Sequence, residues 1–232
     1  GGGVSFCSDA GTVRIINFDI CDITNLNSFE ESEVWKNWIS ENQEFSMNVV
    51  KTRGNSFTDS FDSYQTWIKN MYKLKRDDAD WYIEDGVLKT DSVGANWNFA
   101  TVSSGVYGDV DVSVKVRMTD FNKDTYSSIS LAIGKEKLYS GNDDTGCTIK
   151  IYGNGSVYLF DNYQKTNLNG WNDYVSDPAE FVTLRLVKKG GTITAFLNGQ
   201  QIYHGTNNSV STGFIALGCD YASAEFDDLA IN

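Results

Sequence analysis

Six side chains in this chain are suited to binding a sugar, because they place aromatic rings beside amides and carboxylates. Aromatic rings stack on the apolar faces of pyranoses, and Asn, Asp and Gln side chains bond pairs of hydroxyl groups. The candidate residues are Trp97, Tyr126, Tyr163, Trp171, Asn172 and Tyr174. The last four lie in a loop of roughly twenty residues, a length that often has a functional role. For Trp97, packing in the core is the competing interpretation.

Acid–base catalysis has few candidate residues in this chain. Glu225 and Asp227 stand two positions apart and so face one side of a predicted strand, but Leu229 follows where a further alternating acid would stand. His204 is the only histidine, and a surface turn is its expected place. The sequence has no Cys and His spacing for zinc, no glycine-rich phosphate loop and no serine elbow. We therefore expect a protein that is not an enzyme, with a glycoside hydrolase using Glu225 or Asp227 as the weaker alternative.

Clustered carboxylates offer oxygen ligands for a structural calcium ion. Asp227 and Asp228 are the first candidates, and further acids of this kind are Asp77, Asp78, Asp80, Asp143 and Asp144. None of these segments has the spacing of an EF-hand loop. Solvated surface acids are the competing interpretation, so the sequence leaves calcium binding open.

Length, charge and cysteine content are those of one large acidic domain. The 232 residues carry a formal net charge of −12, which argues against a nucleic-acid partner because phosphate binding needs clustered Lys and Arg. No stretch reaches the ~20 apolar residues of a membrane helix, so we expect no membrane insertion. The four cysteines allow two disulfides in three pairings, and buried thiols are an equal alternative: Cys7, Cys21, Cys147 and Cys219.

Strand periodicity dominates the chain from Asp109 onward. Val110, Val112, Val114 and Val116 alternate with polar residues, which indicates a strand with one buried face. Further strands are predicted at 81–83, 87–88, 97–100, 129–133, 148–152, 156–160, 182–188, 192–197, 200–203, 214–219 and 224–231. Several tight turns join them, and their glycines and asparagines supply φ > 0: Glu84-Asp85-Gly86, Gly153-Asn154-Gly155, Lys189-Gly190-Gly191 and Asn198-Gly199. Strands at this spacing indicate a sandwich or barrel.

The N-terminal part has a different pattern. Residues 29–40 are predicted to form one short helix, which Ser28 caps and whose apolar stripe includes Trp35 and Trp38. A second helical piece is predicted near residues 64–71. We therefore divide the chain into an N-terminal hairpin and helix segment, 1–50, and a β-sandwich domain, 51–232.

Two segments at opposite ends of the chain resemble each other. The stretch from Gly3 to Ile20 and the stretch from Gly213 to Ile231 both read as glycine, an apolar strand ending in cysteine, a polar turn and a second strand. The spacing from cysteine to the final isoleucine is 13 in the first copy and 12 in the second. Either residues 1–50 include the tail of a preceding repeat, or the match reflects pseudo-symmetry or chance.

From about Ser56 to Asn232 the chain resembles the concanavalin A-like, laminin-G-like jelly rolls of bacterial carbohydrate-active and cell-surface proteins. The segments that carry the resemblance are 81–88, 108–118, 182–189, 192–200 and 224–231. The resemblance implies an all-β fold, namely a two-sheet antiparallel β-sandwich, here with one short N-terminal helix. This fold hosts lectins, hydrolases and adhesive domains, so the pattern is more specific for fold than for function.

The function that the resemblance implies is a non-catalytic carbohydrate-binding module of an extracellular bacterial enzyme or surface complex. Its ligand would be a polysaccharide or oligosaccharide such as starch, another glucan or a fructan, and catalytic or scaffold modules would be attached to it. Modules of this kind often hold a structural Ca²⁺. A calcium-dependent protein-interaction or adhesion domain is the alternative from another class.

Overall fold

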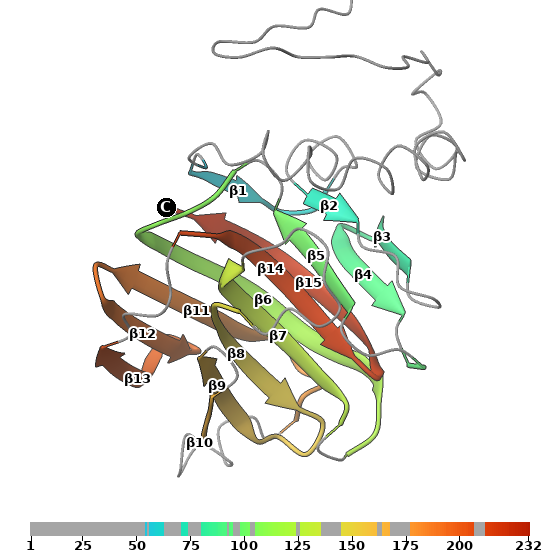
Figure 1. Cartoon of the computed structure of the whole chain (residues 1–232). Coiled ribbons are helices and arrows are strands. Elements are labelled where there is room, and N and C mark those ends of the chain that lie inside the picture. The colour runs from blue at the N-terminus through green and yellow to red at the C-terminus, as the bar shows by residue number, and fades with distance from the viewer. Residues whose placement is uncertain are drawn as a thin grey trace, which may run out of the picture. The chain divides into compact units, whose positions relative to one another are not determined.

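The alternating strands of the sequence form two antiparallel sheets in the computed structural model of the chain (Figure 1). The structure describes residues 54, 56–62, 71–73, 80–91, 93–94, 98–102, 105–123, 126–135, 145–161, 164–167, 177–206 and 212–232. All of these residues lie in the larger of two units, residues 47–232. The predicted helix at 29–40 and the segment 1–50 lie outside the described residues.

The first sheet has eight strands in the order β13-β12-β11-β6-β15-β4-β3, with β1 paired to β15. Its strands are β1 (Phe57–Asp59), β3 (Asp80–Glu84), β4 (Val87–Asp91), β6 (Val110–Phe121), β11 (Val182–Lys189), β12 (Thr192–Leu197), β13 (Gln200–Thr206) and β15 (Ala222–Ile231). All pairings in this sheet are antiparallel.

The second sheet has seven strands in the order β10-β9-β8-β7-β14-β5-β2, again antiparallel throughout. Its strands are β2 (Met71–Lys73), β5 (Asn98–Val102), β7 (Ser128–Lys135), β8 (Cys147–Tyr152), β9 (Val157–Asp161), β10 (Gln164–Asn167) and β14 (Phe214–Asp220). The all-β sandwich predicted from the sequence is therefore confirmed. Met71, at the end of the second predicted helix, begins strand β2 instead, and residues 64–70 lie outside the described part of the chain.

The core lies between the two sheets and follows from the period of two. In β6 the four valines from Val110 to Val116 are at most 4% exposed, while Lys115 on the opposite side is exposed. The predicted hairpin turns are confirmed at Asp85-Gly86 and Asn198-Gly199, where all four residues have positive φ. That geometry matches the right-handed twist of the flanking strands, so each turn fixes the register of its hairpin.

A hydrogen-bonded chain links the sheets inside the core. The Trp81 indole of β3 donates to Asn98 Oδ1 of β5 at 2.6 Å, and the Asn98 amide donates to Thr90 Oγ1 of β4 at 2.8 Å. All three side chains are at most 1% exposed, and Trp81 also packs on Phe226. Buried polar groups that are fully paired favour one arrangement of a core. Trp81 is therefore part of the core.

The last two strands occupy the middle of the two sheets (Figure 1). Strand β14 lies between β7 and β5, and strand β15 lies between β6 and β4. The chain passes from one sheet to the other at Tyr221, which has a φ of 48°. A bulge interrupts β15 between Asp227 and Ala230, and Asp228 there has a φ of 48°. Cys147 and Cys219 are buried thiols, which for these two cysteines excludes the disulfide alternative.

Candidate functional site

One of the six predicted sugar-binding residues is described by the structure. Tyr126 lies in the connection between β6 and β7, and its side chain is 71% exposed. The other five lie outside the described residues, and their contribution stays a prediction: Trp97, Tyr163, Trp171, Asn172 and Tyr174. The site is therefore built from the surfaces that the described strands present.

The outer side of the seven-stranded sheet carries aromatic rings on several neighbouring strands. Because Ile149 and Ile151 of β8 point into the core, the alternate residues of β8 point away from it, and the same holds for the other strands. We call this side the aromatic face and define it by Phe99, Ser130, Ala132, Thr148, Lys150, Tyr152, Tyr158, Phe160, Ala216, Gly218 and Asp220. Phe99, Ala132 and Ala216 form an apolar cluster separate from the main core.

Small residues lie in the middle of the aromatic face, and rings lie on both sides of them. The pairing registers place Phe99, Gly218, Ser130, Lys150 and Tyr158 in one row across five strands. A Cβ atom at Gly218 would come within 2.4 Å of the Ser130 hydroxyl and 2.6 Å of the Phe99 ring. Glycine is required there because both neighbours lean over its backbone.

An ion pair stands among the rings of the aromatic face. Lys150 Nζ lies 2.7 Å from Asp220 Oδ2, and both side chains are only 15% and 13% exposed. The Ser128 hydroxyl donates to the same carboxylate oxygen at 3.2 Å. The ammonium group also lies 5.7 Å from the centre of the Phe160 ring and 6.0 Å from that of Tyr152. Tyr152 packs edge-on against Tyr158 at 5.4 Å, and burial raises the pKa of the Tyr152 hydroxyl.

Tyr126 adjoins one end of the aromatic face. Its neighbour Ser127 donates its hydroxyl hydrogen to the Tyr221 carbonyl at 2.9 Å and accepts a hydrogen bond from the Asn122 amide at 3.0 Å. The turn after β8 is held there as well, because the Gly153 amide donates to the Ser127 carbonyl at 2.8 Å. Tyr221 is also exposed. Two exposed tyrosines therefore lie on turns that continue directly into the Ser128 and Asp220 end of the face.

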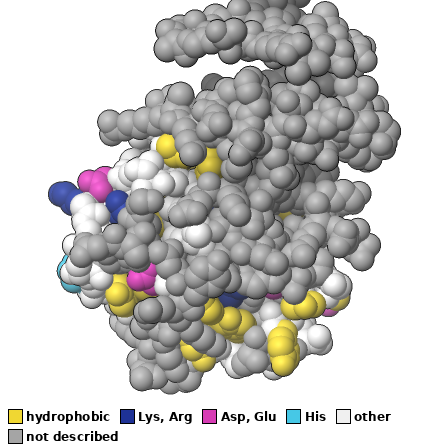
Figure 2. All heavy atoms as spheres, viewed as in Figure 1, with side chains coloured by type: hydrophobic (Ala, Val, Ile, Leu, Met, Phe, Trp, Pro, Cys, Tyr) yellow, Lys and Arg dark blue, Asp and Glu magenta, His cyan; other side chains and the backbone are white. Residues whose placement is uncertain are grey.

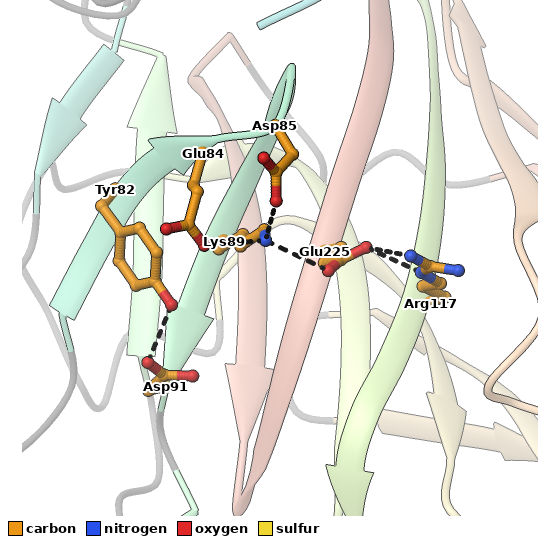
Figure 3. A network of polar contacts seen from close by, with 7 residues as sticks. All are labelled: Tyr82, Glu84, Asp85, Lys89, Asp91, Arg117 and Glu225. Carbon is orange, nitrogen blue, oxygen red and sulfur yellow. Dashed lines mark hydrogen bonds and ion pairs between the residues drawn. The ribbon is translucent and has the colours of Figure 1, made fainter.

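The outer side of the eight-stranded sheet has a different chemistry (Figure 3). Glu225 of β15 accepts two bonds from Arg117 of β6, at 2.7 Å from Nε and 2.6 Å from the terminal nitrogen. Lys89 of β4 lies 3.8 Å from the other oxygen of Glu225 and bonds Glu84 at 3.0 Å. We call this side the ionic face and define it by Tyr82, Glu84, Lys89, Asp91, Asp111, Arg117, Arg185, Phe196 and Glu225.

Several rings on the ionic face are covered by cations or bonded to acids. Arg117 lies over Phe181 and Arg185 over Phe196, at 4.4 Å and 4.9 Å from the ring centres. Tyr82 donates its hydroxyl hydrogen to Asp91 at 3.0 Å (Figure 3), and burial together with that bond raises the Tyr82 pKa to about 12. A ring covered by a guanidinium group has less free surface for stacking on a sugar.

The two acids considered for hydrolysis lie on the ionic face in different surroundings. Glu225 is bound by Arg117 and Lys89, as described above. Asp227 accepts a bond from the Asp228 amide at 2.7 Å, and burial is the first cause that raises its pKa. Glu225 thus has the contacts of a structural residue, because its oxygens are bonded to the neighbouring strands.

The first two predicted calcium ligands, Asp227 and Asp228, lie at the bulge of β15. Asp80 begins β3, and the other candidates lie outside the described residues: Asp77, Asp78, Asp143 and Asp144. Asp228 pairs with Lys115 at 2.5 Å, so its carboxylate already has a cationic partner. Asp59, on the adjacent strand β1, is only 2% exposed, and its Oδ2 atom has no hydrogen-bond partner. Burial and the nearby Asp62 raise the Asp59 pKa, and the bond from the Phe61 amide opposes this. An unpaired buried carboxylate oxygen fits a hard cation. Within the described residues, however, no three acidic, His or Cys side chains are placed together as a metal site.

The single histidine lies on an edge strand. His204 belongs to β13, where its side chain is exposed and Nδ1 lies 3.0 Å from Thr194 Oγ1. Figure 2 shows a histidine side chain, in cyan, at the surface. It is thus a surface residue as predicted, but on a strand and not in a turn. None of the described residues forms a helix long and apolar enough to cross a membrane.

The strand order, the two packed sheets and the layered core define the class of the domain as a concanavalin A-like jelly-roll sandwich. Carbohydrate-binding module CBM66 from Bacillus subtilis is similar, with a TM-score of 0.53 and 13% identity over 71% of this chain and 96% of the module. The β-glucanase of Bacillus licheniformis is similar at a TM-score of 0.54 and 14% identity, over 77% of this chain and 98% of the enzyme. A lichenase derived from a mouse hindgut metagenome has a TM-score of 0.50 and 14% identity over 77% and 99% of the two chains. At these identities the likeness shows the fold alone.

The chain belongs to the family of 3-keto-alpha-glucoside-1,2-lyase-like domains, which matches residues 55–232. Among curated proteins, none matches the chain. The family and the similar structures support a carbohydrate-related function, and both binding modules and enzymes occur among them.

The aromatic face was missed by the sequence prediction, although one signal for it was present. The strand Val157–Asp161 alternates Val157 and Leu159 with Tyr158 and Phe160, so it has apolar residues on both sides. An antiparallel strand with one solvated face normally alternates apolar and polar residues. A second aromatic row on such a strand indicates that its outer side has a packing or binding role.

Proposed function

We propose that the domain is a non-catalytic carbohydrate-binding module that binds a glycan on the aromatic face. The observation that carries the proposal is the pair of half-buried rings Tyr158 and Phe160, which lie beside the buried Tyr152 ring and the Lys150–Asp220 pair. Rings supply stacking surfaces for pyranoses, and the paired charged groups supply donors and acceptors for hydroxyl groups. Tyr126 and Tyr221 extend this surface, and the loop with Trp171, Asn172 and Tyr174 is proposed to complete it.

The surroundings of the acids on the two faces support binding over hydrolysis. A retaining glycosidase needs two carboxyl groups about 5–5.5 Å apart, one of which acts as nucleophile. On the aromatic face, Asp220 is the one carboxylate among the described residues of the defining set, and Lys150 holds it. On the ionic face, Glu225 is occupied by Arg117 and Lys89.

The family name suggests a second candidate, cleavage of a 3-keto-α-glucoside. Elimination next to a ketone needs a base that removes a proton as the bond from the sugar ring to the glycosidic oxygen breaks, which leaves an unsaturated keto sugar and a protonated leaving group. Asp220 on the aromatic face would be that base. A lyase of this kind would release a free sugar from the 3-keto substrate. Loss of that release on changing Asp220→Asn, with ligand binding retained, would favour the lyase.

The test of the leading proposal is affinity electrophoresis through gels with starch, fructan, β-glucan, xylan, pectin or mucin, with and without a chelator. We expect retardation by one polysaccharide, lost in Tyr158→Ala and retained in Phe196→Ala. Both rings are half-buried on outer sheet sides, so the second variant is a matched control from the ionic face. Trp171→Ala and Tyr174→Ala test the predicted loop in the same gels. Free migration of the wild-type protein in every gel would exclude glycan binding and direct the search to a protein partner.

Calcium binding near the β15 bulge is a further part of the proposal. Asp59 and Asp227 are the proposed side-chain ligands, since the unpaired Oδ2 of Asp59 lies on the strand paired to that end of β15. The ion would supply positive charge that offsets the burial of these acids. We expect calcium to raise the midpoint of thermal unfolding in the wild-type protein and to have no such effect in Asp59→Ala.

Secretion and attachment to catalytic or scaffold modules are also proposed, on the strength of the resemblance to surface and carbohydrate-active proteins. An isolated module of this kind holds an enzyme or a cell near its polysaccharide. Detection of the native protein in the culture medium or on the cell surface, by an antibody against residues 51–232, is the expected result. Detection only in the cytosol would contradict this part of the proposal.

A further inference from the structure

The first inference concerns the charge of the aromatic face. Lys150 on β8 and Asp220 on β14 lie on either side of β7, and both side chains are about 85% removed from solvent. The rings of Tyr152 and Phe160 flank the ammonium group. In such poorly solvated surroundings an unpaired charge raises the free energy of the folded protein. The attraction within an ion pair is stronger there than on an open surface.

The two charges of the pair offset each other, while a further cation, Lys135, lies 5.0 Å from the centre of the Phe99 ring. A carboxylate on an acidic sugar could reach the Lys150 ammonium only by competing with Asp220, whose oxygen stands at 2.7 Å and is also bonded by Ser128. The incoming anion would in addition be repelled by Asp220 itself. A neutral hydroxyl group is not repelled by Asp220 and need not displace it. The hydroxyl oxygen can accept a hydrogen bond from the Lys150 ammonium, and the hydroxyl hydrogen can be donated to the Asp220 carboxylate.

We propose that the Lys150–Asp220 pair makes the aromatic face select neutral sugars over sugars that carry a carboxylate. This inference rests on the proposed function and adds to it the class of ligand. The pair acts as a specificity determinant: it disfavours the acidic competitor more than it strengthens the neutral ligand.

The experiment compares a neutral glucan or fructan with polygalacturonate as ligands. In Asp220→Asn the ammonium group loses its partner, so the ratio of acidic to neutral affinity is expected to rise about tenfold or more. Lys150→Met leaves the carboxylate alone and is expected to change the ratio in the opposite direction, which keeps the test decisive if one variant fails to fold. Glu225→Gln makes the same charge change as Asp220→Asn on the ionic face and should leave the ratio unchanged.

The outcomes separate the inference from the proposed function. A wild-type protein that binds the neutral polymer, with a ratio that stays constant in folded Asp220→Asn and Lys150→Met, would overturn the selectivity and leave the binding module intact. Equal affinity of the wild-type protein for the neutral polymer and for polygalacturonate would also overturn the selectivity and leave the binding module intact. A wild-type protein that binds no polymer overturns the proposed function, and the selectivity falls with it.

A second inference follows independently from the burial pattern of β14 and β15. Their inward positions are spaced by two residues, except for two steps of three: from Cys219 to Ala222, where the chain changes sheet, and from Phe226 to Leu229, at the bulge. The segment 4–20 reproduces this pattern without a gap when Val4 is aligned with Ile215. In this alignment each inward position of β14 and β15 has a counterpart 211 positions earlier. The inward positions are Ile215, Leu217, Cys219, Ala222, Ala224, Phe226, Leu229 and Ile231. Their counterparts, in the same order, are Val4, Phe6, Ser8, Gly11, Val13, Ile15, Phe18 and Ile20.

This register differs by one residue from the alignment that pairs Cys7 with Cys219. Cys7 now stands opposite Gly218 on the outward side, and the three-residue step from Ile15 to Phe18 matches the bulge. Asp9 stands opposite Asp220. Because side chains alternate with a period of two, a shift of one residue would place the apolar set on the wrong side. The agreement therefore depends on this register alone.

We infer that residues 4–20 derive from the two closing strands of a preceding copy of this domain, so that the natural protein carries the sandwich in tandem. Two such domains on one chain would bind a polysaccharide with avidity beyond that of either alone. The central positions of β14 and β15 explain why a 17-residue counterpart needs the rest of a sandwich around it.

A graft tests this register. Residues 4–20 replace residues 215–231 in one variant, and residues 3–19 replace them in a matched control shifted by one position. We expect cooperative thermal unfolding, with native Trp81 fluorescence, for the first and not for the second. As an independent readout, the intact mass of the protein from its source should exceed 25.8 kDa by at least one further copy. A native mass without room for a second copy would overturn the inference, whichever graft folds.

Discussion

The two outer sides of this sandwich are built on the same strand geometry and differ in what holds their side chains. On the ionic face, acids and bases from β3, β4, β6 and β15 bond one another across the strands, and two guanidinium groups cover rings. On the aromatic face, rings from β5, β8 and β9 flank small residues and one ion pair. Polar groups that bond one another satisfy the ionic face. On the aromatic face Phe99 and Tyr152 are buried and Lys135 lies over Phe99, so the half-buried rings of Tyr158 and Phe160 are the ones that offer surface to a ligand. The difference identifies which side is the better candidate for recognition.

The largest expected effect is on stability and belongs to the ionic face. Glu225→Gln replaces the carboxylate that faces Arg117 and Lys89 by a neutral amide, which keeps only one acceptor oxygen, while Arg117 stays in place. Since Glu225 is mostly buried and Arg117 is 37% exposed, we expect the free energy of unfolding to fall by about 2 kcal/mol, below the full cost for a buried pair. Urea denaturation measures this. Asp228→Asn, whose partner Lys115 is half exposed, is the control and should change stability much less.

The second effect is on binding and belongs to the aromatic face. Tyr126→Ala removes an exposed ring next to that face, so affinity for the polysaccharide is expected to fall about tenfold with the unfolding midpoint unchanged. Isothermal titration with an oligosaccharide measures it. Tyr82→Phe, which loses only the hydroxyl that donates to Asp91, should bind as the wild type does. If the two variants exchanged these results, the assignment of the faces would be reversed.

The third effect is on the pH dependence of stability and comes from the buried Asp59, which is not a member of the ionic face. The folded state raises the Asp59 pKa above 3.8, so it binds this proton more tightly than the unfolded state does, and stability falls as the pH rises above the unfolded value. Asp59→Asn removes this dependence and is expected to stabilise the metal-free protein by about 1 kcal/mol at neutral pH, with no gain below the unfolded pKa. Thermal melts with chelator at several pH values test it. A loss of stability at neutral pH under these conditions would contradict the reasoning.

The smallest effect concerns a pair at the rim of the ionic face. Arg185 forms two bonds to Asp111, and both side chains are about 40% and 30% exposed. Arg185→Lys keeps the charge and loses the two-pronged geometry and the stacking on Phe196, so we expect a loss of about 0.5 kcal/mol. If Arg185→Lys lowered the free energy of unfolding as much as Glu225→Gln does, burial would not determine how much each ion pair of the ionic face contributes to stability.

Most of the fold could be predicted from the sequence, because period-two alternation and positive-φ turns are local signals. The strand Val110–Phe121 and the turn Asn198-Gly199 are examples. The aromatic face could not be predicted, since it depends on which distant strands are neighbours. Lys150 and Asp220 are 70 residues apart and meet only because β7 lies between their strands. The exposed position of Tyr126 agrees with its local composition, because it follows a polar turn, and its role in binding stays a prediction.

The central position of β14 and β15 has a consequence for how the two sheets are held together. Without residues 214–231, strands β3 and β4 have no connection to β6, strands β2 and β5 have none to β7, and β1 has no partner among the described strands. We therefore expect a break in β14 or β15 to separate the two halves of its sheet, whereas loss of an edge strand such as β13 would leave every other described pairing in place.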